Sequence, residues 1–190
     1  MNYIEKPIVA VTFDLGFQVK ERIDAILSPV AKIIHIKNLS TTERAKLLEN
    51  VRAVFAWVPR DEFSQTEEKL LQNVLFMQLL SAGVDHIDFR RLPSNITIAS
   101  NVGAYAKPMA EHTLAMALAL CKRLLTYHDQ LKQDIFNQFS ENKSLYGSTA
   151  AILGFGGIGK EVARLFKVFN MRILAINRSG KSSEPVDFIG

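Results

Sequence analysis

Short apolar runs alternate with amphipathic stretches along the first hundred residues. The runs are rich in β-branched and aromatic residues, and the stretches between them carry apolar residues at helical spacing. The predicted strands are Ile8–Phe13, Ile33–Ile36, Ala53–Val58, Phe76–Leu80 and Ile96–Ala99, and the predicted helices include Val19–Leu27 and Thr42–Asn50, with Ser40, Thr41 and Thr42 offering N-cap oxygens. Strands that alternate with helices predict a parallel α/β sheet.

A long apolar helix is predicted to follow, opened by Pro108 and running over Met109–Leu125. Its Ala, Leu and Met residues favour helix, and Glu111 lies near the positive helix end. Because the helix is apolar nearly all round, we expect it to be buried between layers, domains or subunits. The polar segment Asp129–Ser148 is predicted to be a partly helical bridge.

A second α/β pattern begins after this bridge. It consists of a strand at Ala150–Leu153, a glycine-rich turn at Gly154–Gly159, a helix at Lys160–Phe169 and a strand at Arg172–Ile176. We therefore expect two domains, residues 1–103 and 104–190. With only two recognisable strands, the second domain would leave a sheet edge open, so the 190-residue chain alone is expected to be unstable or aggregation-prone.

Composition and charge exclude several classes of protein. The chain is 48% hydrophobic and 22% charged, which is typical of a soluble globular protein. Its 23 basic and 19 acidic residues include no basic run, so no nucleic-acid partner is expected. The longest apolar stretch, Leu114–Cys121, is too short to span a membrane, and we expect a cytoplasmic protein. Cys121, the only cysteine, cannot form an internal disulfide.

Glycines at G-x-G-x-x-G spacing lie between the strand and the helix of the second pattern. Gly154 permits a tight turn, Gly156 lets the backbone approach a pyrophosphate, and Gly159 lets the helix pack closely on the strand. The pyrophosphate would bind the free N–H groups at the helix N-terminus. The predicted cofactor loop is Gly154, Phe155, Gly156, Gly157, Ile158 and Gly159. The flanking strands and helix indicate a dinucleotide site rather than a purely structural turn.

The end of the second strand bears on which dinucleotide is bound. An NAD site calls for an acidic residue about 20 positions beyond the glycines. Asn177, Arg178 and Ser179 stand there instead, and these groups suit a 2′-phosphate. The residues therefore favour NADP over NAD, the alternative being that Arg178 is only a solvated loop cation.

Three landmarks in order give the chain a family resemblance. They are Leu80–Asp88, then Asn101–Tyr105 leading into Ala110–Thr113, and then Ile152–Lys160. With them the sequence resembles the D-isomer-specific 2-hydroxyacid dehydrogenases, a family that includes phosphoglycerate dehydrogenase and glyoxylate and hydroxypyruvate reductase. The resemblance implies a flavodoxin-like N-terminal substrate domain followed by the first part of a Rossmann dinucleotide-binding domain.

The resemblance also implies an activity, hydride transfer between NAD(P)H and a small 2-oxo or 2-hydroxy acid bound in the cleft between the domains. In such enzymes the loop matching Ser81, Ala82 and Gly83 offers backbone N–H groups to the substrate carboxylate; without the family, Gly83 would merely end a strand. The family's catalytic arginine, acid and histidine are expected beyond Gly190, so no catalytic residue is assigned. The helix region Met109–Leu125 fits the family's homodimer interface.

Other polar residues near these landmarks have simpler interpretations. Asp85, His86 and Asp88 are too few ligands for a metal site, and we interpret them as turn and helix-cap residues. Glu111 and His112 point to different helix faces, and His112 is interpreted as a packed structural histidine rather than a base.

Two other functions stay open from the sequence. One is a non-catalytic NAD(P)-binding or scaffold protein, and the other is a different Rossmann oxidoreductase such as an amino-acid dehydrogenase. Trp57 or Arg60, at the end of the third strand, could also contact a ligand, because ligands gather at the carboxyl ends of parallel strands.

Overall fold

The computed structural model describes residues 5–190, which separate into two compact units. The first unit ends at Val102 and the second begins at Gly103, one residue before the boundary expected from the sequence. Each unit has its own parallel sheet and its own hydrophobic core.

The first unit contains a five-stranded parallel sheet. Its strands are β1 (Ile8–Val11), β2 (Lys32–His35), β3 (Val51–Ala56), β4 (Phe76–Leu79) and β5 (Thr97–Ala99), and its helices are α1 (Phe17–Leu27), α2 (Thr41–Leu48), α3 (Pro59–Glu62), α4 (Gln65–Glu68) and the 3₁₀ turns η1 (Leu71–Asn73) and η2 (Phe89–Arg91). The strand order β2-β1-β3-β4-β5 is that of a flavodoxin-like sheet and confirms the predicted fold class. The order reverses between β1 and β3, which is the topological switch point.

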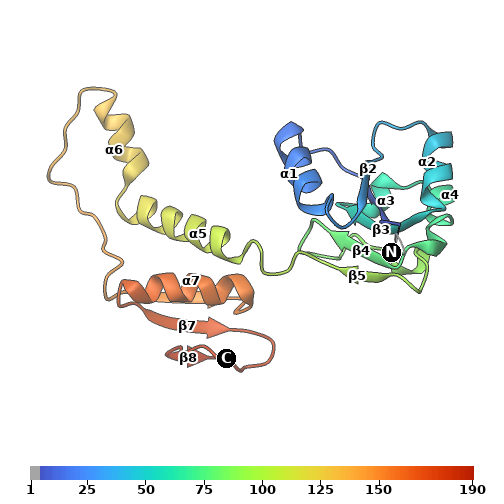
Figure 1. The fold of residues 1–190 in the computed structure, drawn as a ribbon. Coiled ribbons are helices and arrows are strands. Elements are labelled where there is room, and N and C mark those ends of the chain that lie inside the picture. The colour runs from blue at the N-terminus through green and yellow to red at the C-terminus, as the bar shows by residue number, and fades with distance from the viewer. Residues whose placement is uncertain (1–4) are drawn as a thin grey trace. The chain divides into compact units, whose positions relative to one another are not determined.

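The two faces of this sheet are covered unequally. Figure 1 shows α1 on one side of strands β1 and β2, and α2 on the other. The core combines strand residues such as Val54 and Met77 with Leu48 from α2 and Leu71 from η1, all fully buried or nearly so. Helix α1 has no buried residue. Burial of the apolar strand faces against the α2 side is therefore the main source of this unit's stability.

Local capping explains where α2 begins. The Ser40 side chain accepts a hydrogen bond from the Glu43 N–H, and the Glu43 carboxylate accepts one from the Ser40 N–H, which together form a capping box. The Ser40 hydroxyl also donates to the Glu43 carboxylate at 2.6 Å. This bond is the larger cause that holds the pKa of Glu43 below its usual range, and the bond from the Ser40 N–H is the second. Of the three predicted cap residues, Ser40 is therefore the one used, and the helix begins at Thr41.

The second unit contains a parallel sheet of order β6-β7-β8. Its elements are the strands β6 (Thr149–Leu153), β7 (Arg172–Ile176) and β8 (Phe188–Ile189), and the helices α5 (Ala106–Cys121), α6 (Leu124–Leu131) and α7 (Gly157–Val168). The expectation of only two strands was wrong, because Phe188 and Ile189 pair with Leu174 and Ala175 on β7. A two-residue strand in a tail rich in Gly, Ser and Pro carries too little hydrophobic pattern to be read from sequence.

The predicted helix Met109–Leu125 is two helices. Helix α5 begins at Ala106, so that Pro108 lies in the first turn, where a missing N–H costs no hydrogen bond. It ends at Cys121, and Arg123 adopts a left-handed conformation with φ of 49° before α6 starts. No glycine marks this break, which is why the sequence pattern runs through it.

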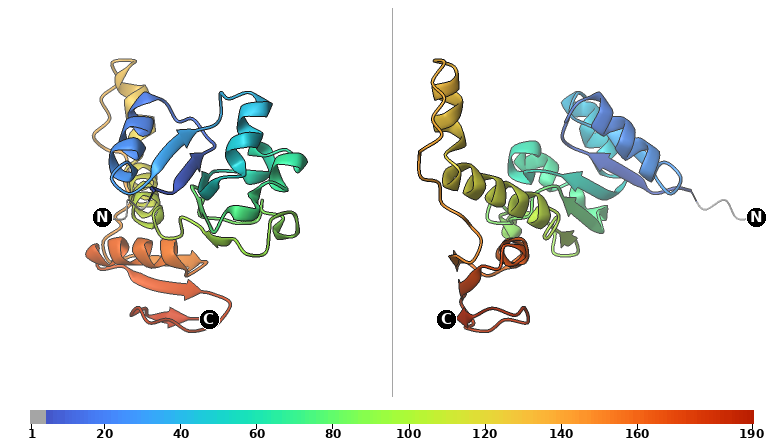
Figure 2. Two further views of the ribbon diagram at one scale, coloured as in Figure 1. Left: turned by 45° about the vertical axis from the view of Figure 1, so that its right-hand side comes forward. Right: turned by 90° about the vertical axis from the view of Figure 1, so that its left-hand side faces the viewer.

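The expected burial of this region is also only partly found. Ala110 is the one residue of α5 that is fully buried, in the core that α5 shares with α7. Met116, Leu120 and Leu125 remain exposed. Figures 1 and 2 show α6 and the loop after it extending away from the sheet of their own unit.

The polar segment Asp129–Ser148 is helical only as far as Leu131. The rest is loop, in which Leu145 is buried in the core of the second unit and Phe139 is almost fully exposed. Between residues 5 and 190, no helix is long and apolar enough to cross a membrane.

Candidate functional site

The glycine-rich loop connects β6 to α7. Gly154 has a φ of +98°, a left-handed conformation that an L side chain rarely adopts. The N–H groups of Gly154 and Phe155 both donate to the Ile176 carbonyl, at 2.9 and 3.1 Å, and so fasten the loop to the end of β7. The Phe155 side chain is buried in the core, so the loop is anchored from both its backbone and this ring.

Gly159 and Gly156 differ in what surrounds them. A Cβ on Gly159 would lie 2.4 Å from the Gly154 carbonyl oxygen and 3.3 Å from Ile152, so only glycine lets α7 approach β6 this closely. A Cβ on Gly156 would meet no atom within 4 Å. Glycine at Gly159 therefore serves internal packing, whereas Gly156 faces open space into which a ligand can approach.

The first turn of α7 presents unpaired backbone donors. Gly156 is the N-cap and offers no side-chain cap, and the first helical hydrogen bond is donated by Lys160 to the Gly156 carbonyl at 3.0 Å. Within the described residues, the N–H groups of Gly156, Gly157, Ile158 and Gly159 have no acceptor. Free donors and the positive end of a helix dipole fit an anionic pyrophosphate.

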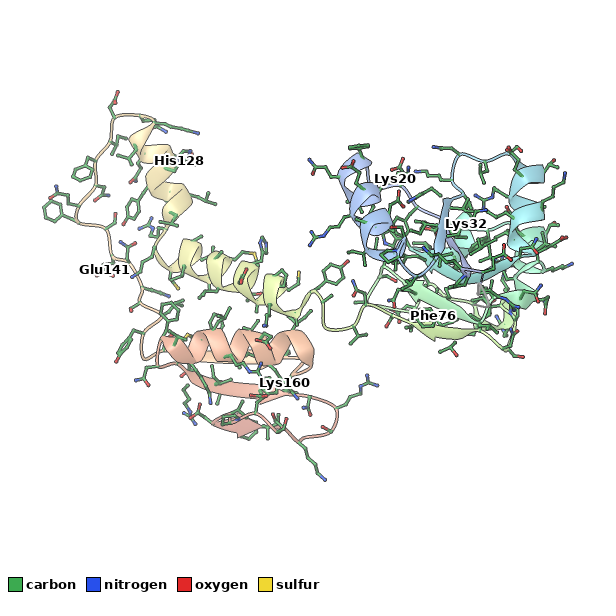
Figure 3. The ribbon with its side chains drawn as sticks, in the orientation of Figure 1. Lys20, Lys32, Phe76, His128, Glu141 and Lys160 are labelled. Atoms are coloured by element: carbon green, nitrogen blue, oxygen red, sulfur yellow. The ribbon has the colours of Figure 1, made fainter. Side chains whose placement is uncertain are left out.

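Two further features surround this helix start. The Ile158 side chain is half exposed, while the Lys160 ammonium, labelled in Figure 3, donates to the Ser183 hydroxyl at 3.4 Å. Arg164 lies one turn further along and pairs with Glu161 and Glu184. The hydrogen bond from Arg164 is the main cause that lowers the pKa of the Glu184 carboxyl.

The loop after β7 holds the residues predicted to select the cofactor. Asn177 uses its side chain within the loop, accepting from the Ser179 N–H and hydroxyl at 3.0 Å and donating to the Lys181 carbonyl at 2.8 Å. Arg178 is exposed, and no hydrogen bond or ion pair to it is found among the described residues. Asn177 thus shapes the loop, and Arg178 is the group free to meet a ligand.

The predicted substrate loop, Ser81-Ala82-Gly83, directly follows β4. Leu80 N–H donates to the Ala56 carbonyl at 2.8 Å, and Asn101 N–H donates to the Ser81 carbonyl at 2.9 Å. No acceptor for the N–H groups of Ala82 and Gly83 is found in residues 5–190. The φ of Gly83 is not left-handed, so glycine is not required by backbone conformation. The loop is therefore held by neighbouring strands and offers two free donors.

The acidic and histidine residues near these landmarks form no metal site. Across the described part of the chain, no group of three or more His, Cys, Asp or Glu could hold a metal ion. Asp88 caps η2 by accepting from the Arg90 N–H at 3.1 Å, and the Arg90 side chain is the first cause of its lowered pKa. The interpretation of His112 as packed was wrong, because its side chain is exposed on α5.

Sequence reasoning missed Glu62, which lies at the switch point of the first sheet. Its carboxylate accepts from the Thr12 hydroxyl at 2.6 Å and from the N–H groups of Trp57 and Val58 at 3.0 and 3.1 Å. Thr12 follows β1 and Trp57 follows β3, so Glu62 ties the carboxyl ends of these two strands together. A glutamate in a polar helical stretch carries no sequence signal for this role. Of the two residues singled out at this strand end, Trp57 is half exposed and Arg60 pairs with Asp61.

The chain is similar to known dehydrogenases. Residues 114–190 match the family model described as D-isomer specific 2-hydroxyacid dehydrogenase, NAD binding domain. The chain is similar to glyoxylate reductase from Pyrococcus furiosus, with 30% identity over 157 residues that cover 73% of this chain and 45% of the relative. It is also similar to D-lactate dehydrogenase from Escherichia coli, with 28% identity over 142 residues that cover 73% of this chain and 43% of the relative.

A solved structure extends the likeness to nearly the whole chain. The glycerate dehydrogenase related protein from Thermoplasma acidophilum matches with a TM-score of 0.67 and 33% identity, covering 96% of this chain and 58% of that one. The chain spans about half the length of the relatives it matches. These matches confirm the resemblance to the D-isomer-specific 2-hydroxyacid dehydrogenases, and they support a nicotinamide dinucleotide as the cofactor class.

Proposed function

We propose that this chain, whose residues 114–190 match the NAD-binding domain of the D-isomer-specific 2-hydroxyacid dehydrogenases, acts in hydride transfer between NAD(P)H and a small 2-oxo or 2-hydroxy acid. The observation that carries the proposal is the row of unpaired N–H groups at the start of α7, behind a loop whose Gly156 faces open space. In this proposal the first unit is the substrate domain and the second the cofactor domain.

Each unit supplies one half of the binding chemistry. The bound nicotinamide would supply the hydride, while the residues from Gly154 to Gly159 hold the pyrophosphate. The N–H groups of Ala82 and Gly83 would hold the substrate carboxylate, since successive unpaired backbone donors suit an anion. None of the four histidines is given the role of proton donor.

The first experiment is a titration of the full chain with NADH and NADPH, followed by nicotinamide fluorescence. The test variant is Gly156→Ala, because its Cβ would enter the open space without touching the protein. We expect the variant to keep the circular dichroism spectrum of the parent and to lose at least tenfold in dinucleotide affinity, as a methyl group holds the pyrophosphate away from the N–H donors. Equal affinity in the parent and the variant, or no binding by the parent, would refute this site.

The cofactor is proposed to be NADPH in preference to NADH. Support comes from Arg178, exposed and without a partner in the described chain, in a loop with no carboxylate at the position where an NAD site calls for one. Replacing Arg178 by Ala is expected to weaken NADPH about tenfold and NADH less than twofold, because only NADPH carries the 2′-phosphate. The control is Arg172→Ala, an exposed arginine at the opposite end of β7. Tighter binding of NADH than NADPH by the parent would contradict this preference.

We further propose that the region Met109–Leu125 joins two copies of the chain. Met116, Leu120 and Leu125 leave large apolar side chains exposed on two consecutive helices, and an apolar patch of this kind favours association. Sedimentation velocity should show a dimer that the double variant Leu120→Lys and Leu125→Lys converts to monomer. Val168→Lys, on an equally exposed apolar residue of α7, should remain dimeric. A parent that sediments as a monomer would overturn the proposal.

A further inference from the structure

A hydrogen-bond chain in the first unit connects His86 to the Ser81-Ala82-Gly83 loop. His86 Nε2 lies 3.2 Å from the Trp57 carbonyl oxygen and 3.3 Å from the Ser81 hydroxyl. The Ser81 hydroxyl in turn donates to the Gly83 carbonyl at 3.0 Å. One imidazole nitrogen therefore bridges the end of β3 and the loop after β4.

The direction of these hydrogen bonds follows from the groups involved. A carbonyl oxygen can only accept, so the nitrogen facing Trp57 must carry the proton, which makes the Nε2–H tautomer the one that fits. The Ser81 hydroxyl donates its hydrogen to the Gly83 carbonyl, so a lone pair of its oxygen accepts from the same Nε2–H of His86. The network is thus fully directed from His86 through Ser81 to Gly83.

The other end of the network is also fixed. Trp57 is held through its N–H by Glu62, whose carboxylate also accepts from Thr12. The carbonyl to which His86 donates therefore belongs to a residue braced from the switch point of the sheet. Because the His86 imidazole is hydrogen-bonded to this fixed carbonyl, it can restrain the Ser81-Ala82-Gly83 loop on its other side.

We propose that His86 is a positioning residue, which fixes the Ser81-Ala82-Gly83 loop so that the N–H groups of Ala82 and Gly83 converge on a carboxylate. The loop's carboxylate role rests on the function proposed above, whereas the restraint by His86 does not. The Asn101 N–H holds the Ser81 carbonyl and so orients the peptide group that carries the Ala82 N–H. The Ser81 hydroxyl holds the Gly83 carbonyl, so the peptide group that carries the Gly83 N–H is restrained on both sides. Removing the His86 donor leaves the Ser81 hydroxyl without that restraint and the Trp57 carbonyl without that donor.

The test uses His86→Phe, which keeps a planar ring but no donor, and His86→Gln, whose side-chain amide supplies an N–H donor in place of the imidazole. The control is His128→Ala, an exposed histidine on α6 of the second unit. Backbone ¹⁵N relaxation of the full chain, without ligand, should show increased motion at Ala82 and Gly83 in His86→Phe and parent-like values in the Gln and control variants. A long-range ¹H–¹⁵N spectrum of the parent at pH 8 should show the proton on Nε2.

Binding of oxalate, a small dicarboxylate probe, is then followed by the amide shifts of Ala82 and Gly83. His86→Phe should weaken this binding about tenfold, and His86→Gln should restore it to within about twofold of the parent. Parent-like relaxation in His86→Phe, or a proton on Nδ1 in the parent, would overturn the positioning role. If loop motion increases in His86→Phe as expected, but the Ala82 and Gly83 amides of the parent do not respond to oxalate, the carboxylate function fails while the role of His86 stands.

Discussion

Replacing Gly159 with alanine should lower the stability of the second unit and leave that of the first unit unchanged. The new Cβ would lie 2.4 Å from the Gly154 carbonyl oxygen, so the atoms must move apart by about 1 Å to reach ordinary contact. The atom in the way is backbone, and α7 must therefore shift from β6, at a cost of about 1–3 kcal/mol. Alanine's better helix propensity returns up to about 1 kcal/mol. We expect a net destabilisation of up to about 2 kcal/mol, confined to the second unit.

The assay compares two optical signals during urea unfolding. Far-ultraviolet circular dichroism follows both units, whereas fluorescence of Trp57, the only tryptophan, follows the first unit. Gly159→Ala should move a circular dichroism transition to lower urea and leave the Trp57 transition unchanged. Gly157→Ala is the matched control, because its Cβ meets no atom within 4 Å in the same helical turn, and it should unfold like the parent or slightly later.

Equal urea midpoints for Gly159→Ala and Gly157→Ala would show that the Cβ at position 159 causes no clash. A shift of both optical signals by the same amount would equally contradict the prediction, since the clash lies wholly within the second unit. Gly159→Ala should also lower the dinucleotide affinity, because a displaced α7 carries its free N–H groups away from the proposed pyrophosphate position.

Three other changes have definite expected results. Arg44→Met leaves the buried Glu67 without its ion-pair partner and should cost the first unit about 3 kcal/mol by Trp57 fluorescence in urea. Burial raises the pKa of Glu67, but hydrogen bonds from Arg44 and Ser64 outweigh it and the pKa is lowered, so this carboxylate stabilises the fold above the ordinary glutamate pKa of about 4.3. The contribution is lost as the pH falls through the lowered value, which a pH titration of the same fluorescence should show in the parent and much less in Arg44→Met. Gly154→Ala should cost about 1 kcal/mol in the circular dichroism transition, because φ is +98°. Ser40→Ala removes the α2 cap and should cost about 1 kcal/mol, measured by thermal melting.

Several elements were predictable because their signals are local. The apolar runs locate all five strands of the first sheet to within a few residues, and the spacing of Gly154, Gly156 and Gly159 locates the turn after β6. Hydrophobic periodicity and glycine spacing are properties of neighbouring residues, so they can be recognised in the sequence without knowledge of the fold. The Arg123 break is the counter-example, since its left-handed conformation occurs in a residue that gives no such signal.

Short-range sequence patterns were enough to predict two α/β units, a glycine-rich loop between strand and helix, and the family resemblance. The contacts between residues far apart in the sequence became visible only in the fold. It paired the two-residue β8 with β7, brought Glu62 to the ends of β1 and β3, and set His86 between Trp57 and Ser81. These contacts join residues up to 50 positions apart, and they depend on strand order and register, which only the packing of the whole sheet fixes.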